Sequence, residues 1–144
     1  MDELENIKMI CPKYQIKLMI LFGSYNTEKY NSNSDIDIAI QIESKENIYN
    51  IKKNIIQELS LILKREIDLV ILNYADPLLK LQVANNGRLV FEKIEGIYNT
   101  FKVNAIKEYY DARKFFKLEK KIINNYIKGD NKNGRQRVSP PQVK

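Results

Sequence analysis

The 144-residue chain is 44% hydrophobic, a size and composition that fit one domain with a sizeable core. It has no histidine and one cysteine, which excludes Ser-His-Asp and Cys-His catalysis, a Cys/His zinc cluster and an internal disulfide. Of the net charge of +6, +4 lies in residues 128–144, where five Lys and Arg residues accompany one Asp. Because the rest of the chain is nearly neutral, we expect no direct nucleic-acid binding.

The chain has no candidate for a membrane segment. No apolar run approaches the roughly 18–20 residues that cross a bilayer. The N-terminus "MDELENIKMI" is acidic, whereas a signal peptide is basic and then apolar. The sequence therefore predicts a soluble protein of the cytoplasm.

The spacing of apolar residues predicts alternating strands and helices. In chain order, we expect a helix over 2–12, strands over 16–22 and 35–42, a helix over 45–65, a strand over 66–72, a helix from Asp76-Pro77 to Asn86-Gly87, a strand over 88–92 and a long helix over 96–128. This order predicts an α/β fold with a small mixed β-sheet and flanking helices. The last residues, 129–144, combine Pro, Gly, Ser and charge without an apolar face, so we expect a disordered basic tail.

The strand "DIDIAIQI" (35–42) places isoleucine on one face and Asp35 and Asp37 on the other. Two carboxylates on one side of a strand lie about 6.5–7 Å apart, and they repel unless a cation lies between them. Mg²⁺ prefers one or two protein carboxylates, completed by water and substrate phosphates. An Asp-x-Asp alone is more typical of an exposed strand face, so this pattern needs a second feature to indicate a site.

Gly23 and Ser24 supply that second feature at the end of the strand over 16–22. Glycine lets the backbone approach a ligand closely, and a following turn directs N–H groups and the Ser24 hydroxyl toward a phosphate. A Gly-Ser pair alone is most often a simple turn. Together with the two aspartates it predicts a site for a metal-bound nucleotide.

The stretch "GSYNTEKYNSNSDIDIAI" resembles the DNA polymerase β-type nucleotidyltransferase superfamily, and its spacing fits the minimal nucleotidyltransferases (MNT). "EIDLVIL" supplies Asp68 where such domains carry a third acidic residue. Glu66 lies on the same strand face as Asp68, and we favour Asp68 because "IDLVIL" matches the family better. The resemblance covers about residues 5–125 and implies a polymerase β-type core with a long C-terminal helix, which we assign to residues 1–128.

The resemblance implies a role for each of these residues. Asp35 and Asp37 would bind two Mg²⁺ ions, and Asp68 would complete the second site and help to deprotonate the attacking hydroxyl. Gly23 and Ser24 would hold the β- and γ-phosphates of ATP. The product would be a nucleoside monophosphate on an acceptor, with pyrophosphate as the leaving group.

The loop after Ser24 departs from the family pattern. Where many members have Ala-Arg-Gly, this chain has Asn26, Thr27 and Glu28. Loss of the arginine is expected to weaken triphosphate binding, and Glu28 would repel the triphosphate if it points inward. Lys29 is a candidate substitute for the missing cation.

Minimal nucleotidyltransferases of this kind resemble the antitoxin half of HEPN–MNT toxin–antitoxin pairs, whose HEPN partner is an RNase. That resemblance implies transfer of AMP from ATP to a tyrosine of the toxin, with the two proteins forming a hetero-oligomer. Two alternatives stay open. One is an antitoxin that neutralises the same toxin by binding alone, and the other is a small-molecule nucleotidyltransferase of the aminoglycoside type.

The predicted long helix carries more aromatic residues than one narrow stripe needs. One interpretation is that they pack on the domain's own sheet. The other is that the aromatics outside the stripe, Tyr110 and Phe115, contact another protein, since aromatic residues are favoured at interface centres. Cys11, in the first predicted helix, is expected to be a buried hydrophobic residue.

Overall fold

The computed structural model describes residues 3–23, 35–43 and 47–133, with side chains as far as residue 129. The elements in chain order are α1 (Glu3–Lys13), β1 (Ile16–Phe22), β2 (Ile36–Ile42), α2 (Ile48–Leu63), β3 (Ile67–Ile71), the 3₁₀ turn η2 (Leu72–Tyr74), α3 (Pro77–Asn86), β4 (Arg88–Glu92) and α4 (Ile97–Asn133). The predicted alternation of strands and helices is confirmed. Among these residues, no helix is long and apolar enough to cross a membrane.

The strands form one mixed sheet in the order β3-β2-β1-β4. β1 runs antiparallel to both β2 and β4, whereas β2 and β3 are parallel. Helix α2 makes the crossover that a parallel pair requires. β3 is therefore an edge strand, and the strands that carry the candidate acidic residues are neighbours.

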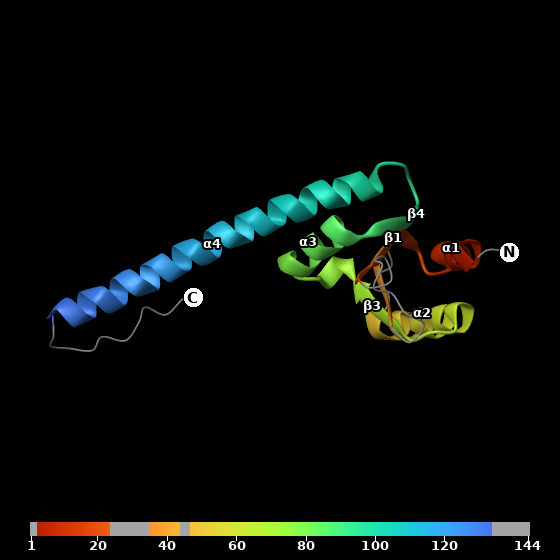
Figure 1. The fold of residues 1–144 in the computed structure, drawn as a ribbon, viewed down its shortest axis with the longest axis horizontal. Helices are drawn as coiled ribbons and strands as arrows, with labels where there is room; N and C mark the ends of the chain where they lie inside the picture. Colours follow the sequence, from red (N-terminus) through yellow and green to blue (C-terminus); the bar gives the residue numbers. More distant parts are fainter. Residues whose placement is uncertain (1–2, 24–34, 44–46, 134–144) are drawn as a thin grey trace. The chain divides into compact units, whose positions relative to one another are not determined.

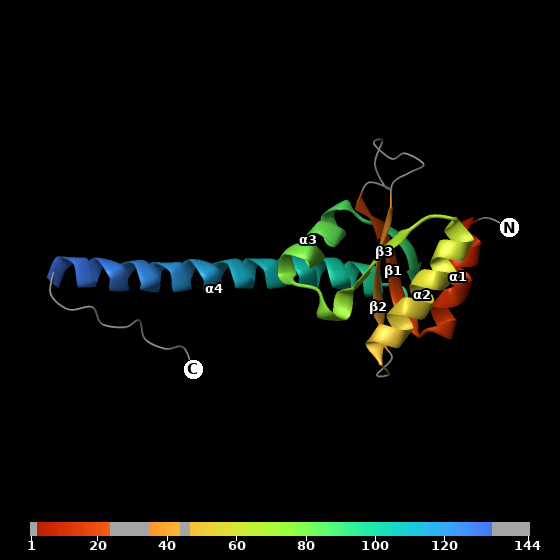
Figure 2. The same cartoon turned by 90° about the horizontal axis from the view of Figure 1, so that it is seen from below.

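One face of the sheet is a closed apolar core. The four isoleucines of β2, which are Ile36, Ile38, Ile40 and Ile42, are at most 3% exposed. They pack in one cluster with apolar residues of α1 and α2, among them the buried Cys11, as predicted. α1 and α2 lie side by side on this face in both views (Figures 1 and 2). We call it the isoleucine face.

The other face is covered by α3 and the first turns of α4. Ala39 of β2 packs there with Val83 and Ala84 of α3 and with Phe101 and Ala105 of α4. Asp76 caps α3 as predicted, because its carboxylate accepts a hydrogen bond from the N–H of Leu79 at 2.8 Å. We call this the aspartate face, since Asp37 shares it with Ala39.

Residues 1–106 and 107–144 form two compact units. In the second unit α4 continues to Asn133, past Gly129, so the predicted helix end was wrong. A glycine inside a helix costs only about 1 kcal/mol relative to alanine, which is too little to end a long helix. Residues 129–133 belong to this helix, the rest of the tail lies outside the described residues, and the disorder of the tail stays a prediction. The domain limit at residue 128 stays a prediction.

The long helix is buried only in its first part. Phe101 and Ala105 are at most 8% exposed, whereas Phe116, Ile123 and Ile127 are 49–65% exposed. The interpretation that the aromatic residues pack on the domain's own sheet is confirmed for Phe101 and Tyr98. For the aromatic residues beyond residue 106 it stays a prediction. Tyr110 and Phe115, the predicted contacts to another protein, are also exposed.

Candidate active site

The predicted acidic residues meet at one end of the sheet. Asp37 in β2 is the register partner of Phe22 in β1 and of Asp68 in β3. Register partners on adjacent strands have their side chains on the same face, and the strands are about 4.8 Å apart. The fold thus brings Asp37 and Asp68 together from positions 31 residues apart in the sequence.

Asp35 and Glu66 lie at the same end, one step outside the strands. Asp35 directly precedes β2 and is exposed, as is Glu66 before β3. The backbone carbonyl of Glu66 accepts a hydrogen bond from the N–H of Ile36 at 2.9 Å, which fixes the start of the parallel pair. This register places Asp68 beside Asp37, and Glu66 would lie level with Asp35. The catalytic and metal-binding roles of Asp35, Asp37 and Asp68 stay predictions.

Gly23 directly follows β1 and lies beside the Asp37 carboxylate. Its φ is +73°, and a Cβ at this position would lie 2.0 Å from Asp37 Oδ2 and 2.9 Å from Asp37 Cγ. No side chain fits there without displacing the carboxylate, so only glycine allows Asp37 its position. Our sequence argument for Gly23 concerned a phosphate, and the structure adds this second reason. Ser24 and the loop residues Asn26, Thr27, Glu28 and Lys29 lie outside the described residues.

The donor set fits a divalent cation that is bound together with a substrate. Among the described residues, no three His, Cys, Asp or Glu side chains are clustered closely enough to hold a metal by themselves. Mg²⁺ seldom uses such a closed cage and takes one or two carboxylates, with substrate phosphates and water as the other ligands. Asp37 and Asp68, adjacent on one face, with Asp35 two residues before Asp37, supply ligands of this kind.

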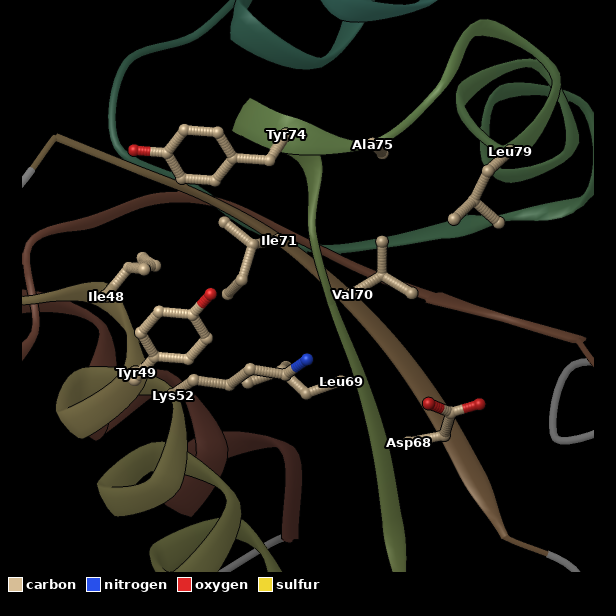
Figure 3. A pocket seen from close by; sticks show the side chains of 10 residues that line it. All are labelled: Ile48, Tyr49, Lys52, Asp68, Leu69, Val70, Ile71, Tyr74, Ala75 and Leu79. Carbon is tan, nitrogen blue, oxygen red and sulfur yellow. The ribbon is translucent and has the colours of Figure 1, made fainter.

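A groove of about 590 Å³ lies across the edge of the sheet at β3. Its lining includes Tyr49 and Lys52 of α2, Asp68 of β3, Tyr74 of η2 and Leu79 of α3, drawn in Figure 3. Sequence reasoning missed this groove, because these residues come from four separate elements. The available signal was Tyr74, an aromatic residue in the short connection after the third strand, which is 76% exposed.

Comparisons with known proteins agree with this geometry. Residues 5–96 match the family "Polymerase beta, Nucleotidyltransferase". The chain is 30% identical over 122 residues to the protein adenylyltransferase MntA of Aphanizomenon flos-aquae (strain 2012/KM1/D3), an alignment that covers 78% of this chain and 81% of that protein.

Two solved structures extend the likeness to the whole fold. A crystal structure of a toxin–antitoxin with AMP-PNP contains a chain that is 26% identical, with a TM-score of 0.70 and coverage of 88% of this chain and 99% of that chain. A complex of the tri-AMPylated Shewanella oneidensis HEPN toxin with MNT antitoxin gives 24% identity, a TM-score of 0.64 and coverage of 87% and 96%, and shows the fold alone. The chain belongs to the polymerase beta nucleotidyltransferase family, and within it to the minimal nucleotidyltransferases of the MntA group.

Proposed function

We propose that this chain is an Mg²⁺-dependent protein adenylyltransferase that acts as an antitoxin. It transfers AMP from ATP to a tyrosine of a cognate HEPN RNase and thereby neutralises that toxin. The observation that carries the proposal is the pairing of Asp37 with Asp68 beside Gly23, in a chain 30% identical to a protein adenylyltransferase. ATP as the substrate is supported by the AMP-PNP in the related toxin–antitoxin. We place the reaction in the cytoplasm.

Each residue of the site has its own proposed role. Asp35 and Asp37 would hold two Mg²⁺ ions together with the triphosphate, and Asp68 would complete the second site. When bound, the metals neutralise charge on the attacking and leaving oxygens. Gly23 and Ser24 bind the β- and γ-phosphates through backbone N–H groups and the Ser24 hydroxyl. The chain has no histidine, so another group must take the proton of the acceptor, and we assign this role to Asp68 from the family resemblance.

The transfer is an in-line displacement at the α-phosphorus of ATP. The tyrosine oxygen of the toxin forms a bond to this phosphorus while its proton passes to the Asp68 carboxylate. The bond between the α-phosphorus and the bridging oxygen breaks, and pyrophosphate leaves with that electron pair. The attached AMP adds a negative charge and bulk to the RNase, and both oppose the entry of RNA phosphates.

A second candidate is an antitoxin that silences the same toxin by binding alone. The sequence Asn26-Thr27-Glu28 favours it, because the triphosphate loses the cation that relatives place in this loop. The open groove that Asp68 lines favours the enzyme, because it leaves room for an acceptor side chain beside that carboxylate.

The test is the intact mass of the cognate HEPN toxin, after incubation with the chain, Mg²⁺ and each nucleoside triphosphate in turn. We expect a gain of one or more AMP masses with ATP, and no gain with the Asp35→Asn/Asp37→Asn variant. A stable complex and a silenced RNase without any mass change would establish the binding antitoxin instead.

A further inference from the structure

Strand β3 has an open edge. β2 pairs with one side of it, and no strand of the described residues pairs with the other. The Ile36 N–H donates to the Glu66 carbonyl, so the backbone groups of Glu66 face β2. Backbone groups alternate in direction along a strand, so those of Asp68 also face β2, whereas those of Ile67 and Leu69 point outward. This edge can hydrogen-bond an added strand.

The edge lacks three of the features that commonly keep edge strands from pairing, because β3 (IDLVI) has no lysine, no proline and no bulge. It is five residues long, and its one charged side chain, Asp68, lies on the aspartate face. Its pairing with β2 runs in unbroken register from Ile67 to Ile71. An open edge of this kind can accept an extended chain as an added strand.

The groove adds side-chain contacts on both sides of this edge (Figure 3). On the side of α2 it presents Tyr49, which is 81% exposed, and Lys52. On the aspartate face it presents Asp68 and Leu79. Tyr74, 76% exposed, lies beyond the end of β3. A bound strand would direct alternate side chains to these two sides.

We propose that an extended segment of the partner toxin adds to the open edge of β3 as a further strand, and that this segment carries the hydroxyl that accepts AMP. The proposal rests on the proposed function and deepens it. The groove is continuous with the candidate active site, because Asp68 both lines the groove and pairs with Asp37. Docking along β3 therefore delivers a side chain to the carboxylate that takes its proton.

The geometry also predicts the pattern of the bound segment. The acceptor tyrosine must lie on the aspartate face, next to Asp68. Residues two positions away from it lie on the same face, about 6.5–7 Å along the strand, where Val70 and Leu79 favour an apolar side chain. The residues directly before and after the tyrosine would face Tyr49 and Lys52.

Amide hydrogen exchange tests the docking directly. The full-length chain is measured alone, with AMP-PNP and Mg²⁺, and in complex with the HEPN protein. We expect the exchange of the Ile67 and Leu69 amides, which face outward, to slow at least about tenfold only in the complex. The Asp68 and Val70 amides, which face β2, are the internal control, and their exchange changes little. A stable complex with unchanged exchange at Leu69 overturns the proposal, as does slowing by AMP-PNP alone.

A matched pair of double variants tests the contribution of the side chains that line the groove. Tyr49→Ala/Tyr74→Ala removes two exposed groove residues, and Met9→Ala/Leu61→Ala removes exposed apolar residues that do not line it. We expect the first to lower kcat/KM for toxin modification about tenfold without changing the affinity for AMP-PNP, and the second to change neither. Equal rates for both variants and the unmodified chain overturn the proposal.

The two proposals fail in different ways. If the toxin gains no AMP but the Leu69 amide is protected in the complex, the adenylyltransferase proposal fails while the groove still binds the toxin. In the opposite case, the toxin gains AMP, the exchange of the Leu69 amide is unchanged in the complex, and Tyr49→Ala/Tyr74→Ala modifies the toxin at the unmodified rate. The adenylyltransferase proposal is then supported and the docking proposal is wrong.

Discussion

The two faces of β2 belong to one seven-residue strand, but one face packs in the core and the other carries the candidate active site. On the isoleucine face, all four isoleucines are at most 3% exposed and join a single cluster with α1 and α2. On the aspartate face, Asp37 is half-buried beside Asp68, which is exposed. Because side chains alternate along the strand, residues that stabilise the core and residues of the candidate active site are direct neighbours in the sequence. Substitutions on the two faces are expected to affect different measurements.

The largest effect is expected at Gly23, where the aspartate face is most crowded. Gly23→Ala places a Cβ 2.0 Å from Asp37 Oδ2, so the carboxylate must move, and a displacement of about 1 Å can cost roughly 100-fold in rate. We expect AMP transfer to the toxin to fall at least about 100-fold, measured from initial rates by mass spectrometry. The control is Gly96→Ala, which also introduces a side chain at positive φ but meets no atom within 4 Å. A comparable loss of transfer in Gly96→Ala would refute the role given to the Asp37 contact.

The isoleucine face should respond in stability instead. Ile38 is fully buried, so Ile38→Ala is expected to lower the free energy of unfolding by about 2–5 kcal/mol, and Ile38→Val by about 0.5–1.5 kcal/mol. Urea unfolding followed by circular dichroism measures both. Asp68→Asn, on the other face, should stay within about 0.5 kcal/mol of the unmodified chain and yet abolish transfer. If Asp68→Asn unfolded as readily as Ile38→Ala, the two faces would not be separate in function.

A smaller effect is expected where the end of β2 is joined to η2. The Asn73 side chain accepts a hydrogen bond from the Ile42 N–H at 3.0 Å and donates one to the Ile42 carbonyl at 2.9 Å. Asn73→Ala removes both bonds and should cost about 1–2 kcal/mol in urea unfolding. Asn85→Ala, at an exposed position of α3, is the matched control and should be nearly neutral. Equal stability of the two variants would show that the Asn73 bonds contribute nothing.

The smallest effect is a pH dependence at the outer side of the isoleucine face. Lys13 of α1 donates a hydrogen bond to Glu58 of α2, and this contact lowers the pKa of Glu58 from its ordinary value of 4.5. A lowered folded-state pKa means that this stabilisation is present above about pH 4.5 and is lost as the pH falls through the lowered value. Unfolding midpoints between pH 7 and pH 3 should therefore fall less steeply for Glu58→Gln. An identical pH profile for both proteins would contradict the contribution of this pair.

Local patterns were sufficient for most of the fold. The strict alternation of residues 35–42 predicted β2, and Asp76-Pro77 predicted the start of α3, because capping and side-chain direction depend on neighbours in the sequence. Asp68 was favoured over Glu66 from the family likeness, and the register of the parallel pair places it beside Asp37. The helix end at Gly129 was predicted wrongly, since a single glycine is a weak stop signal.

The sequence by itself determined the helices and strands and the two faces of β2, because these follow from side-chain spacing. It also indicated that Asp35, Asp37 and Asp68 form one site, because they match a family motif. Only the tertiary structure decided why position 23 must be glycine, since the contact is between its backbone and a carboxylate 14 residues away on the next strand. It also decided that β3 lies at the sheet edge, where four elements form the groove. Both features depend on which strands are neighbours, and strand order is set by long-range packing that no local pattern contains.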